Sequence, residues 1–415
     1  MRGDAQQRRV AITGLGCVTS LGFDLPESWE ALLAGRSGVR SIPRLREAAL
    51  PVQIAAPVLG DLPLPGVPEK ERRRLDRFTC FALAATAEAF ASARLARGDF
   101  DGTRAGAAIG SGIGGILTLT ENHRALLAGG PRRVSPFGIP MCIANMASGL
   151  VAIHFGLRGP NFCTATACAS GAHAIGQALD TIRSGAADLM LAGGAEAPIC
   201  DFVVAGFARM RALSTRNEEP ERASRPFDAG RDGFVIGEGA GALVLEEWEH
   251  ARARGAPIRA ELVGYASTAD AEHIVEPTAE GDGPRRCMEN ALLDAGLAPG
   301  DVDYVNAHAT STPAGDRAEA RALQQLFGTG TSPWVSSTKS SLGHSLGASG
   351  AVEAALTVMA LETGWLPPTL NLERPDETCA LNHVAEKARK THPNVAISNS
   401  FGFGGTNVTL VLKHG

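Results

Sequence analysis

The sequence lacks three features that would place the protein in a special class. No two of its eight cysteines have the CxxC spacing of zinc sites and redox dithiols. No run is apolar enough to span a bilayer, and the nine mostly polar residues before the strand-like segment at 10–13 leave no room for a signal peptide. The net charge of -5 gives no general reason to expect a nucleic acid or a membrane surface as a partner. We therefore expect a cytoplasmic globular protein.

The composition is that of a large α/β protein. A chain of 415 residues with 44% hydrophobic content can bury a substantial core, either as two domains or as a duplicated one. Apolar runs at 189–192, 302–307 and 395–398 predict buried strands, and amphipathic segments between them predict helices, including one that stops near Gly185. This alternation predicts an α/β fold.

Two parts of the chain repeat each other. The segment Ala169-Ser170-Gly171-Ala172, followed by a helix to Gly185, matches Ala348-Ser349-Gly350-Ala351, followed by a helix to Gly364; 171 to 350 and 185 to 364 are the same offset, 179. A glycine-rich turn at 237–241 and another at 402–405 each lead into an apolar strand. We infer two copies of one α/β unit, of which the first has additional residues before its helix. Those residues are expected to form a substrate-binding cap.

Cys168 lies among small side chains where an extended segment is predicted to turn into a helix. A helix start has unpaired N–H groups and about half a positive charge, which favour a thiolate and stabilise an anion beside the sulfur. This placement predicts a nucleophile for acyl transfer through a thioester. A buried structural cysteine is the alternative, because free cysteine is among the most buried residue types.

His308 closes the predicted strand at 302–307 and opens a polar loop. Side chains at the ends of strands emerge into clefts on a rigid support, so this histidine is a candidate site residue. After the loop, Asp316 and Glu319 resemble the capping box of a helix start.

Two further segments have the character of a site. Lys339 lies in a Ser- and Gly-rich loop that leads to His344, which precedes the repeated helix. The turn at 399–407 surrounds Phe403 with glycines that let backbone N–H groups approach a ligand closely. Singly these signals are weak, since a lone histidine or lysine is often structural or solvated.

Five segments together are similar to one enzyme family. They read TATACASG, RPFDAGRDGFVIGEGAGALVLE, NAHATSTPAGD, SSTKSSLGH and SNSFGFGGTN. With these motifs the chain resembles the beta-ketoacyl-acyl-carrier-protein synthases, above all the elongating type of bacterial type II fatty acid synthesis. The resemblance implies a thiolase-like fold, with duplicated α/β halves in a layered α-β-α-β-α arrangement, and a homodimer. The first half is expected at 1–253, with the nucleophile and cap insertions, and the second at 254–415, with the catalytic histidines.

The resemblance implies an acyltransferase with a role for each motif. Cys168, His308 and His344 would form a catalytic triad, with Lys339 supporting the second histidine, and the backbone N–H groups of Cys168 and Phe403 would form the oxyanion hole. The reaction is a decarboxylating condensation of malonyl-acyl-carrier protein (malonyl-ACP) with an acyl chain on the cysteine, which gives a 3-oxoacyl-ACP two carbons longer. No metal or other cofactor is implied, because the phosphopantetheine arrives on the carrier protein.

Other residues match family positions that bind the substrate or the carrier protein. Thr310 and Thr312 match positions that hydrogen-bond to the phosphopantetheine, Phe403 matches a gate to the acyl pocket, and Ile113 matches a residue that limits chain length. Four basic residues match positions that dock the acidic acyl carrier protein: Lys70, Arg73, Arg74 and Arg211. A solvated helix face is the alternative explanation for this basic cluster.

Four residues depart from the family pattern. Ala309 replaces a common glycine, Gly138 replaces a bulky residue near the acyl pocket, and Ser341 and Ser345 flank His344 where apolar side chains are common. They leave the triad intact and the acyl chain length open. An altered pocket would fit a specialised ketosynthase of a type II polyketide or other secondary-metabolite pathway, which is the alternative function.

Three other classes fit less well. A non-catalytic chain-length partner would lack the nucleophile and histidines. A degradative thiolase would need a second active-site cysteine near the C-terminus, and none follows Cys379. A dinucleotide-binding loop at Gly14-Leu15-Gly16 lacks its third glycine, which Thr19 replaces.

Overall fold

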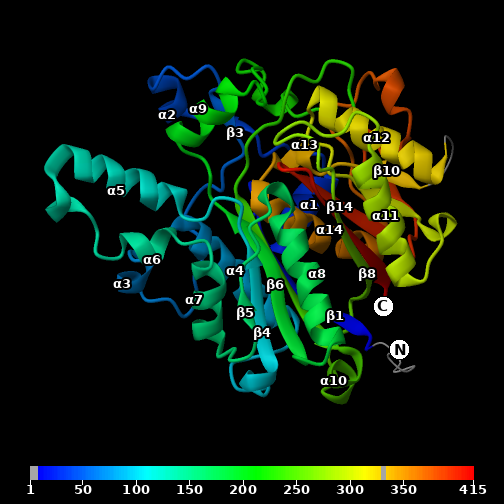
Figure 1. Ribbon diagram of the computed structural model, residues 1–415, viewed down its shortest axis with the longest axis horizontal. Coiled ribbons are helices and arrows are strands. Elements are labelled where there is room, and N and C mark those ends of the chain that lie inside the picture. Colours follow the sequence, from blue (N-terminus) through cyan, green and yellow to red (C-terminus); the bar gives the residue numbers. More distant parts are fainter. Residues whose placement is uncertain (1–7, 329–332) are drawn as a thin grey trace.

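A mixed β-sheet runs through the computed structural model, which describes residues 8–328 and 333–415 (Figure 1). Among these residues the sheet has eleven strands in the order β12-β10-β9-β14-β15-β8-β1-β7-β6-β4-β5. They are β1 (Val10–Val18), β4 (Ala105–Gly110), β5 (Asn161–Phe162), β6 (Leu189–Glu196), β7 (Gly239–Glu247), β8 (Ala260–Ala269), β9 (Tyr304–Asn306), β10 (Trp334–Ser336), β12 (Asn382–His383), β14 (Val395–Gly402) and β15 (Thr406–His414). Two small ribbons pair β2 (Arg40–Ser41) with β3 (Ile54–Ala55) and β11 (Trp365–Leu366) with β13 (Arg389–Lys390).

Helices cover the sheet on both faces. The longer ones are α1 (Leu25–Leu33), α4 (Arg77–Ser92), α5 (Ile116–Gly129), α7 (Met146–Phe155), α8 (Ser170–Arg183), α9 (Asp201–Arg209), α11 (Asp282–Ala295), α12 (Pro313–Phe327) and α14 (Ser349–Thr363). The shorter ones are α2 (Pro43–Glu47), α3 (Glu69–Arg72), α6 (Gly138–Cys142), α10 (Trp248–Ala253) and α13 (Lys339–Leu342). None of the helices in the described residues is long and apolar enough to cross a bilayer.

The sheet is symmetric about the junction of β1 and β8, which confirms the duplication. On one side of the junction the order is β1-β7-β6-β4-β5, and on the other it is β8-β15-β14-β9-β10. In each run the first three strands are antiparallel and the last three are parallel. The two runs meet through an antiparallel pairing of Ala11 with Glu261 and Ile12 with Ala260.

The repeat extends to the turns before the two central helices. A 3₁₀ turn at Ala167–Ala169 precedes α8, and one at Leu346–Ala348 precedes α14, so both turns begin 179 residues apart, as 346 minus 167 gives. Each turn starts with a residue in the left-handed region, Ala167 at φ 50° and Leu346 at φ 46°. Such backbone is unfavourable for residues other than glycine, and strain of this kind concentrates at functional sites.

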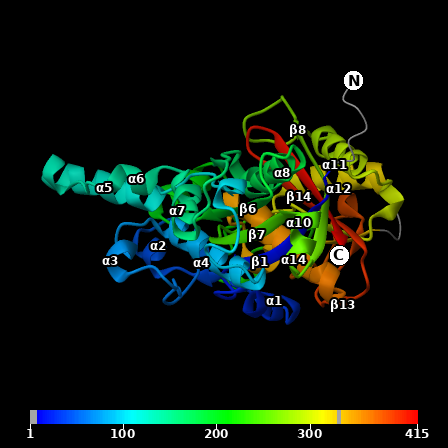
Figure 2. The ribbon, with the colours of Figure 1, turned by 90° about the horizontal axis from the view of Figure 1, so that it is seen from below.

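The helices α8 and α14 form the middle layer of the molecule (Figure 2). Helix α8 packs on β6 and β4 of its own half and on β15 and β8 of the other, and α14 packs on β14 and β7 in the same way. Helices α4 and α7 cover the outer face of the first half, and α11 covers that of the second. The expected layered α-β-α-β-α arrangement is therefore confirmed. The predicted strands at 189–192, 302–307 and 395–398 correspond to β6, β9 and β14.

Candidate active site

A cavity of about 330 Å³ brings the three predicted catalytic side chains together. Cys168 comes from the turn before α8, His308 from the end of β9, and His344 from the segment before α14. The predicted substrate-binding residues Thr310, Thr312 and Phe403 line the same cavity. The duplicated fold thus supplies the cysteine from one half and both histidines from the other.

The turn around Cys168 is held by Ser170, the first residue of α8. The Ser170 Oγ accepts a hydrogen bond from the N–H of Thr166 at 2.9 Å and donates one to the carbonyl of Ala167 at 2.7 Å. These bonds fix the strained backbone at Ala167, so that Cys168 lies at the N-terminal end of the central helix with only 8% of its surface exposed.

The Cys168 thiol is protonated in the resting site. Burial raises the pKa of this thiol to about 12, although the positive charge of Lys339 and the backbone N–H groups of Phe403 and Cys168 lower it. The carboxylate of Glu196 raises it further. The thiolate predicted from the helix start is therefore not the resting form, because desolvation outweighs the nearby donors.

The glycine-rich turn after β14 reaches the cysteine because Gly402 has no side chain. A Cβ at this position would lie 2.7 Å from the carbonyl oxygen of Thr166 and 3.2 Å from the backbone nitrogen of Cys168. The turn can therefore bring the N–H of Phe403 to the sulfur, beside the N–H of Cys168 itself. Two backbone donors at the nucleophile are what an oxyanion hole requires.

The two histidines face each other in the cavity as neutral rings. Their ring centroids are 5.3 Å apart and the ring planes are nearly perpendicular, at 85°. Burial lowers the pKa of both His308 and His344 well below the usual value, and the charge of Lys339 lowers both further. A neutral imidazole carries one N–H donor, so each ring can donate one hydrogen bond to a substrate oxygen. The Nδ1 of His308 is buried without a partner in the described residues.

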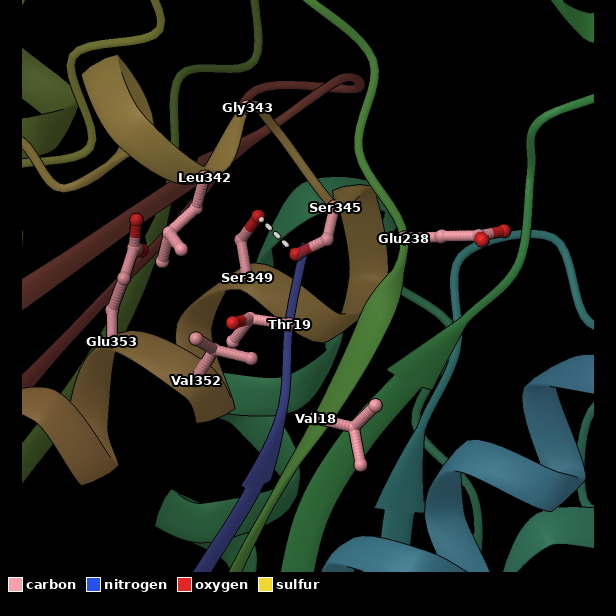
Figure 3. A pocket seen from close by; sticks show the side chains of 9 residues that line it. All are labelled: Val18, Thr19, Glu238, Leu342, Gly343, Ser345, Ser349, Val352 and Glu353. Atoms are coloured by element: carbon pink, nitrogen blue, oxygen red, sulfur yellow. Dashed lines mark hydrogen bonds between the residues drawn. The ribbon is translucent and has the colours of Figure 1, made fainter. Parts of the chain in front are cut away.

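Lys339 acts on the histidines through space. Its ammonium group is buried and bonds to Glu353 Oε1 of α14. Burial raises the pKa of Glu353 to about 7, and the lysine opposes that shift. The sequence predicted that Lys339 would support His344, but the hydrogen bond that orients this ring comes from Ser349, whose Oγ lies 2.9 Å from Nδ1. Figure 3 shows Ser349 and Glu353 on successive turns of α14, beside a small space that both residues line.

Two carboxylates of α12 hold the loop that follows His308. Glu319 accepts hydrogen bonds from the N–H groups of His308 at 2.9 Å and Ala309 at 2.6 Å, and Asp316 accepts one from Ser311 at 3.0 Å. The prediction that Asp316 and Glu319 form a capping box is wrong, because α12 already begins at Pro313. Their side chains instead fix the loop that carries Thr310 and Thr312, whose hydroxyl oxygens are 3.2 Å apart.

Sequence reasoning missed Glu196, at the end of β6. This buried carboxylate accepts hydrogen bonds from the loop that carries Ile113 and from Gly347, which lies three residues after His344. Ile113 does not line the cavity in this structure; it lies 37% exposed, with its backbone N–H bonded to Glu196. The position of the carboxylate at the end of a strand was the available signal.

The predicted docking residues are divided between two places. Arg211 lines the cavity, so it lies at the catalytic site. Lys70, Arg73 and Arg74 lie on or next to α3, which is close to α6 in the view of Figure 1. The guanidinium of Arg74 lies 4.5 Å from the ring centroid of Phe137, just before α6.

None of the described residues before the nucleophile lines this cavity, so the substrate-binding cap expected there stays a prediction. The additional residues of the first half include α5 and α6, which project from the body of the molecule as an arm (Figures 1 and 2). Of the first half's described residues, Cys168 and residues that follow it line the cavity, among them Phe207 and Phe234. The connection after β6 therefore forms the first half's share of the cavity wall.

The structure shows what surrounds each of the four residues that depart from the family pattern. The methyl group of Ala309 packs in an apolar cluster of the second half, away from the cavity. Gly138 starts α6, where a Cβ would lie 3.2 Å from the side chain of Asn122. Ser341 is buried, and its hydroxyl has no hydrogen-bond partner in the described part of the chain, whereas the Ser345 Oγ lies 3.2 Å from that of Ser349.

Comparison with known families matches nearly the whole chain. Residues 7–251 match the family described as Beta-ketoacyl synthase, N-terminal domain, and residues 259–373 match Beta-ketoacyl synthase, C-terminal domain. A protein of Coxiella burnetii named 3-oxoacyl-[acyl-carrier-protein] synthase 2 is 50% identical over 98% of this chain and 99% of its own. The protein of the same name from Synechocystis is 49% identical over 98% of both chains.

Solved structures agree with this grouping. A beta-ketoacyl synthase from Burkholderia phymatum superposes with a TM-score of 0.92, is 40% identical, and covers 98% of this chain and 100% of its own. A ketosynthase of a type II polyketide synthase, solved with its acyl-carrier protein, also superposes with a TM-score of 0.92 at 34% identity, over 99% of this chain and 100% of its own. With the cysteine and both histidines gathered in one cavity, this chain belongs to the beta-ketoacyl synthase family.

Proposed function

We propose that this protein is a 3-oxoacyl-ACP synthase of the second elongating type, an acyltransferase that condenses malonyl-ACP with a cysteine-bound acyl chain in fatty acid biosynthesis. The observation that carries the proposal is the meeting of Cys168, His308 and His344 at one cavity. The full-length identity of 50% to a protein with this name supports it.

In the first step, acyl-ACP transfers its chain to Cys168. The sulfur attacks the thioester carbon and gives up its proton, and the negative oxygen that forms is stabilised by the N–H groups of Cys168 and Phe403. A neutral imidazole is a suitable acceptor for the thiol proton. The carrier thiol leaves, and the acyl chain remains on the cysteine as a thioester.

In the second step, malonyl-ACP loses carbon dioxide and forms an enolate. N–H donors from His308 and His344 stabilise the enolate oxygen, and the nearby charge of Lys339 adds positive potential. Neutral histidines suit this task, because both can donate without a proton transfer. The carbanion then attacks the acyl thioester, the cysteine sulfur leaves, and a 3-oxoacyl-ACP two carbons longer is released.

The partner that delivers both substrates is an acyl carrier protein. Thr310 and Thr312 line the cavity with neighbouring hydroxyls, which suit the amide groups of a phosphopantetheine arm. Lys70, Arg73, Arg74 and Arg211 supply positive charge for docking an acidic protein. The complex of a 34% identical ketosynthase with its acyl-carrier protein supports a partner of this kind.

A second copy of the chain is the other expected partner. The arm and α7 expose a group of large apolar side chains: Leu119, Leu126, Leu127, Val134, Phe137, Ile139, Ile143 and Ile153. The short strand β5 forms one edge of the sheet on this side of the molecule. Exposed apolar patches and open sheet edges favour association, which supports a homodimer. Sedimentation equilibrium tests this, and a monomer at micromolar concentration would contradict it.

The experiment that tests the function is an elongation assay. The purified protein is incubated with malonyl-ACP and linear acyl-ACPs of increasing length, and the products are identified by mass spectrometry. Release of carbon dioxide with formation of 3-oxoacyl-ACP supports the proposal, and failure to elongate any linear chain would contradict it. Extension of a poly-β-keto chain in preference to linear ones would support the specialised ketosynthase instead.

A further inference from the structure

The ring of His344 is held from behind by two serine hydroxyls. The Ser349 Oγ lies 2.9 Å from Nδ1 of His344, and the Ser345 Oγ lies 3.2 Å from the Ser349 Oγ (Figure 3). The rings of Phe234 and His308 pack against the same ring at nearly right angles, and the centroid of each is 5.3 Å from that of His344. The two hydroxyls and Nδ1 therefore form a short line of hydrogen bonds behind a ring whose rotation is restricted.

The hydrogens of this line can be arranged in two ways. In one, Ser345 donates to Ser349, Ser349 donates to Nδ1, and the imidazole carries its proton on Nε2. In the other, Nδ1 carries the proton and donates to Ser349, Ser349 donates to Ser345, and the Ser345 proton needs an acceptor of its own. Among the described residues, Ser349 is the one hydrogen-bond partner of the Ser345 side chain.

The first arrangement satisfies every hydrogen of the line, and the second leaves one without an acceptor. A hydroxyl hydrogen without an acceptor in this partly buried position costs free energy, so the first arrangement is favoured. The space beside the hydroxyls is about 10 Å³, at the lower limit for one water molecule, so a water that accepts the Ser345 hydrogen from this side has little room.

The duplicated fold shows that this position supports a catalytic group in both halves. Ser170 and Ser349 each begin a central helix, and 349 minus 170 is the repeat offset of 179. Ser170 fixes the turn of the nucleophile through Thr166 and Ala167, whereas Ser349 bonds to His344. Equivalent serines therefore hold Cys168 in the first half and His344 in the second.

We propose that Ser349, held by Ser345, is a positioning residue that fixes His344 in the tautomer with its proton on Nε2. This tautomer places an N–H donor on the side of the ring away from Ser349, where the enolate oxygen of decarboxylated malonyl-ACP must be stabilised. The inference rests on the proposed role of His344, and it adds the reason why this ring donates rather than accepts. It gives Ser345, a departure from the family pattern, a defined task.

The first test measures the tautomer directly. The protein is labelled with ¹⁵N-histidine, and the His344 signals are assigned by their loss in His344→Ala. We expect wild-type His344 to carry its proton on Nε2, and Ser349→Ala to give a mixture of tautomers. A proton on Nδ1 in the wild-type protein would overturn the proposal, whether or not the protein proves to be an active synthase.

The second test separates the two half-reactions. Ser349→Ala should lower the kcat of malonyl-ACP decarboxylation about three- to tenfold, the effect of one hydrogen bond, and leave the KM for acyl-ACP in the transfer to Cys168 nearly unchanged. Ser345→Ala should have a smaller effect in the same direction, and it serves as the second variant if Ser349→Ala folds poorly.

Ser341→Ala is the matched control, because it removes a buried hydroxyl three residues before His344 that has no hydrogen-bond partner in the described residues. We expect this variant to keep wild-type decarboxylation and the wild-type tautomer. Equal decarboxylation by Ser349→Ala and Ser341→Ala would overturn the proposal. A wild-type protein that does not decarboxylate malonyl-ACP would instead contradict the proposed function, while the tautomer measurement would still decide the role of Ser349.

Discussion

Replacing Glu196 with glutamine should destabilise the protein, although the two side chains have nearly the same shape. Glu196 Oε1 accepts hydrogen bonds from Ser111 Oγ at 2.9 Å and Ile113 N at 3.1 Å. Oε2 accepts from Gly112 N at 2.6 Å and Gly347 N at 3.0 Å. Burial raises the pKa of Glu196, and the four hydrogen-bond donors around its carboxylate oppose that shift by stabilising the ionised form. In Glu196→Gln, an amide NH₂ at the Oε2 position faces two backbone donors, whereas at the Oε1 position it faces the N–H of Ile113 and the Ser111 hydroxyl, which can turn to accept.

The magnitude follows from the one backbone donor, the N–H of Ile113, that loses its acceptor in the better of the two orientations. A buried donor without a partner costs about 1–3 kcal/mol. Part of this is offset, because the variant no longer buries a charge that has no Lys or Arg partner in the described residues. We expect a net loss of about 1–2 kcal/mol in the free energy of unfolding.

The assay is urea denaturation followed by circular dichroism. Ser111→Ala is the control, because it removes one donor and leaves the carboxylate with three; its expected cost is about 0.5–1.5 kcal/mol. A glutamine variant as stable as the wild type, or more stable than Ser111→Ala, would refute the argument that Glu196 is held as a carboxylate by four donors.

Three further predictions concern charge and protonation. Because burial raises the pKa of Cys168 to about 12 in the folded protein, its alkylation by iodoacetamide should accelerate about tenfold per pH unit between pH 7 and 9.5, and a plateau near pH 8 would contradict this. Because burial lowers the pKa of His308 and His344, the unfolded chain binds more protons below about pH 6.5, so the free energy of unfolding should fall as the pH drops from 7 to 5. A His308→Gln/His344→Gln variant should show a weaker dependence, and an equal slope would contradict the assignment. Reversing both Arg73 and Arg74 to Glu should raise the KM for acyl-ACP severalfold at low salt with less effect on kcat, whereas Lys387→Glu in the second half should not; unchanged kinetics at low salt would rule out docking there.

The repeat and the site residues could be predicted because they are local patterns in the chain. The offset of 179 residues appeared as matching helix segments, and the structure extends it to paired strained turns at Ala167 and Leu346. Each catalytic side chain follows a strand or begins a helix, so its place on a rigid support could be inferred from its neighbours in sequence.

Interactions between distant segments could not be predicted in the same way. Desolvation of Cys168 depends on what packs around it, so a local argument from the helix start gave the wrong protonation state. Asp316 and Glu319 have capping-box spacing, but the helix begins earlier and their carboxylates turn back to the His308 loop. Ser349 reads as an ordinary helix-start serine until the fold brings its hydroxyl to His344.

The most direct test of the account compares the two half-reactions in His308→Ala and His344→Ala. Each variant is given malonyl-ACP, with carbon dioxide release as the readout, and separately acyl-ACP, with the acyl adduct on Cys168 measured by mass spectrometry. We predict that both variants lose decarboxylation and still form the adduct on the cysteine. Decarboxylation at the wild-type rate in either variant would contradict the role assigned to that histidine, and absence of the adduct in the wild-type protein would contradict the role of Cys168.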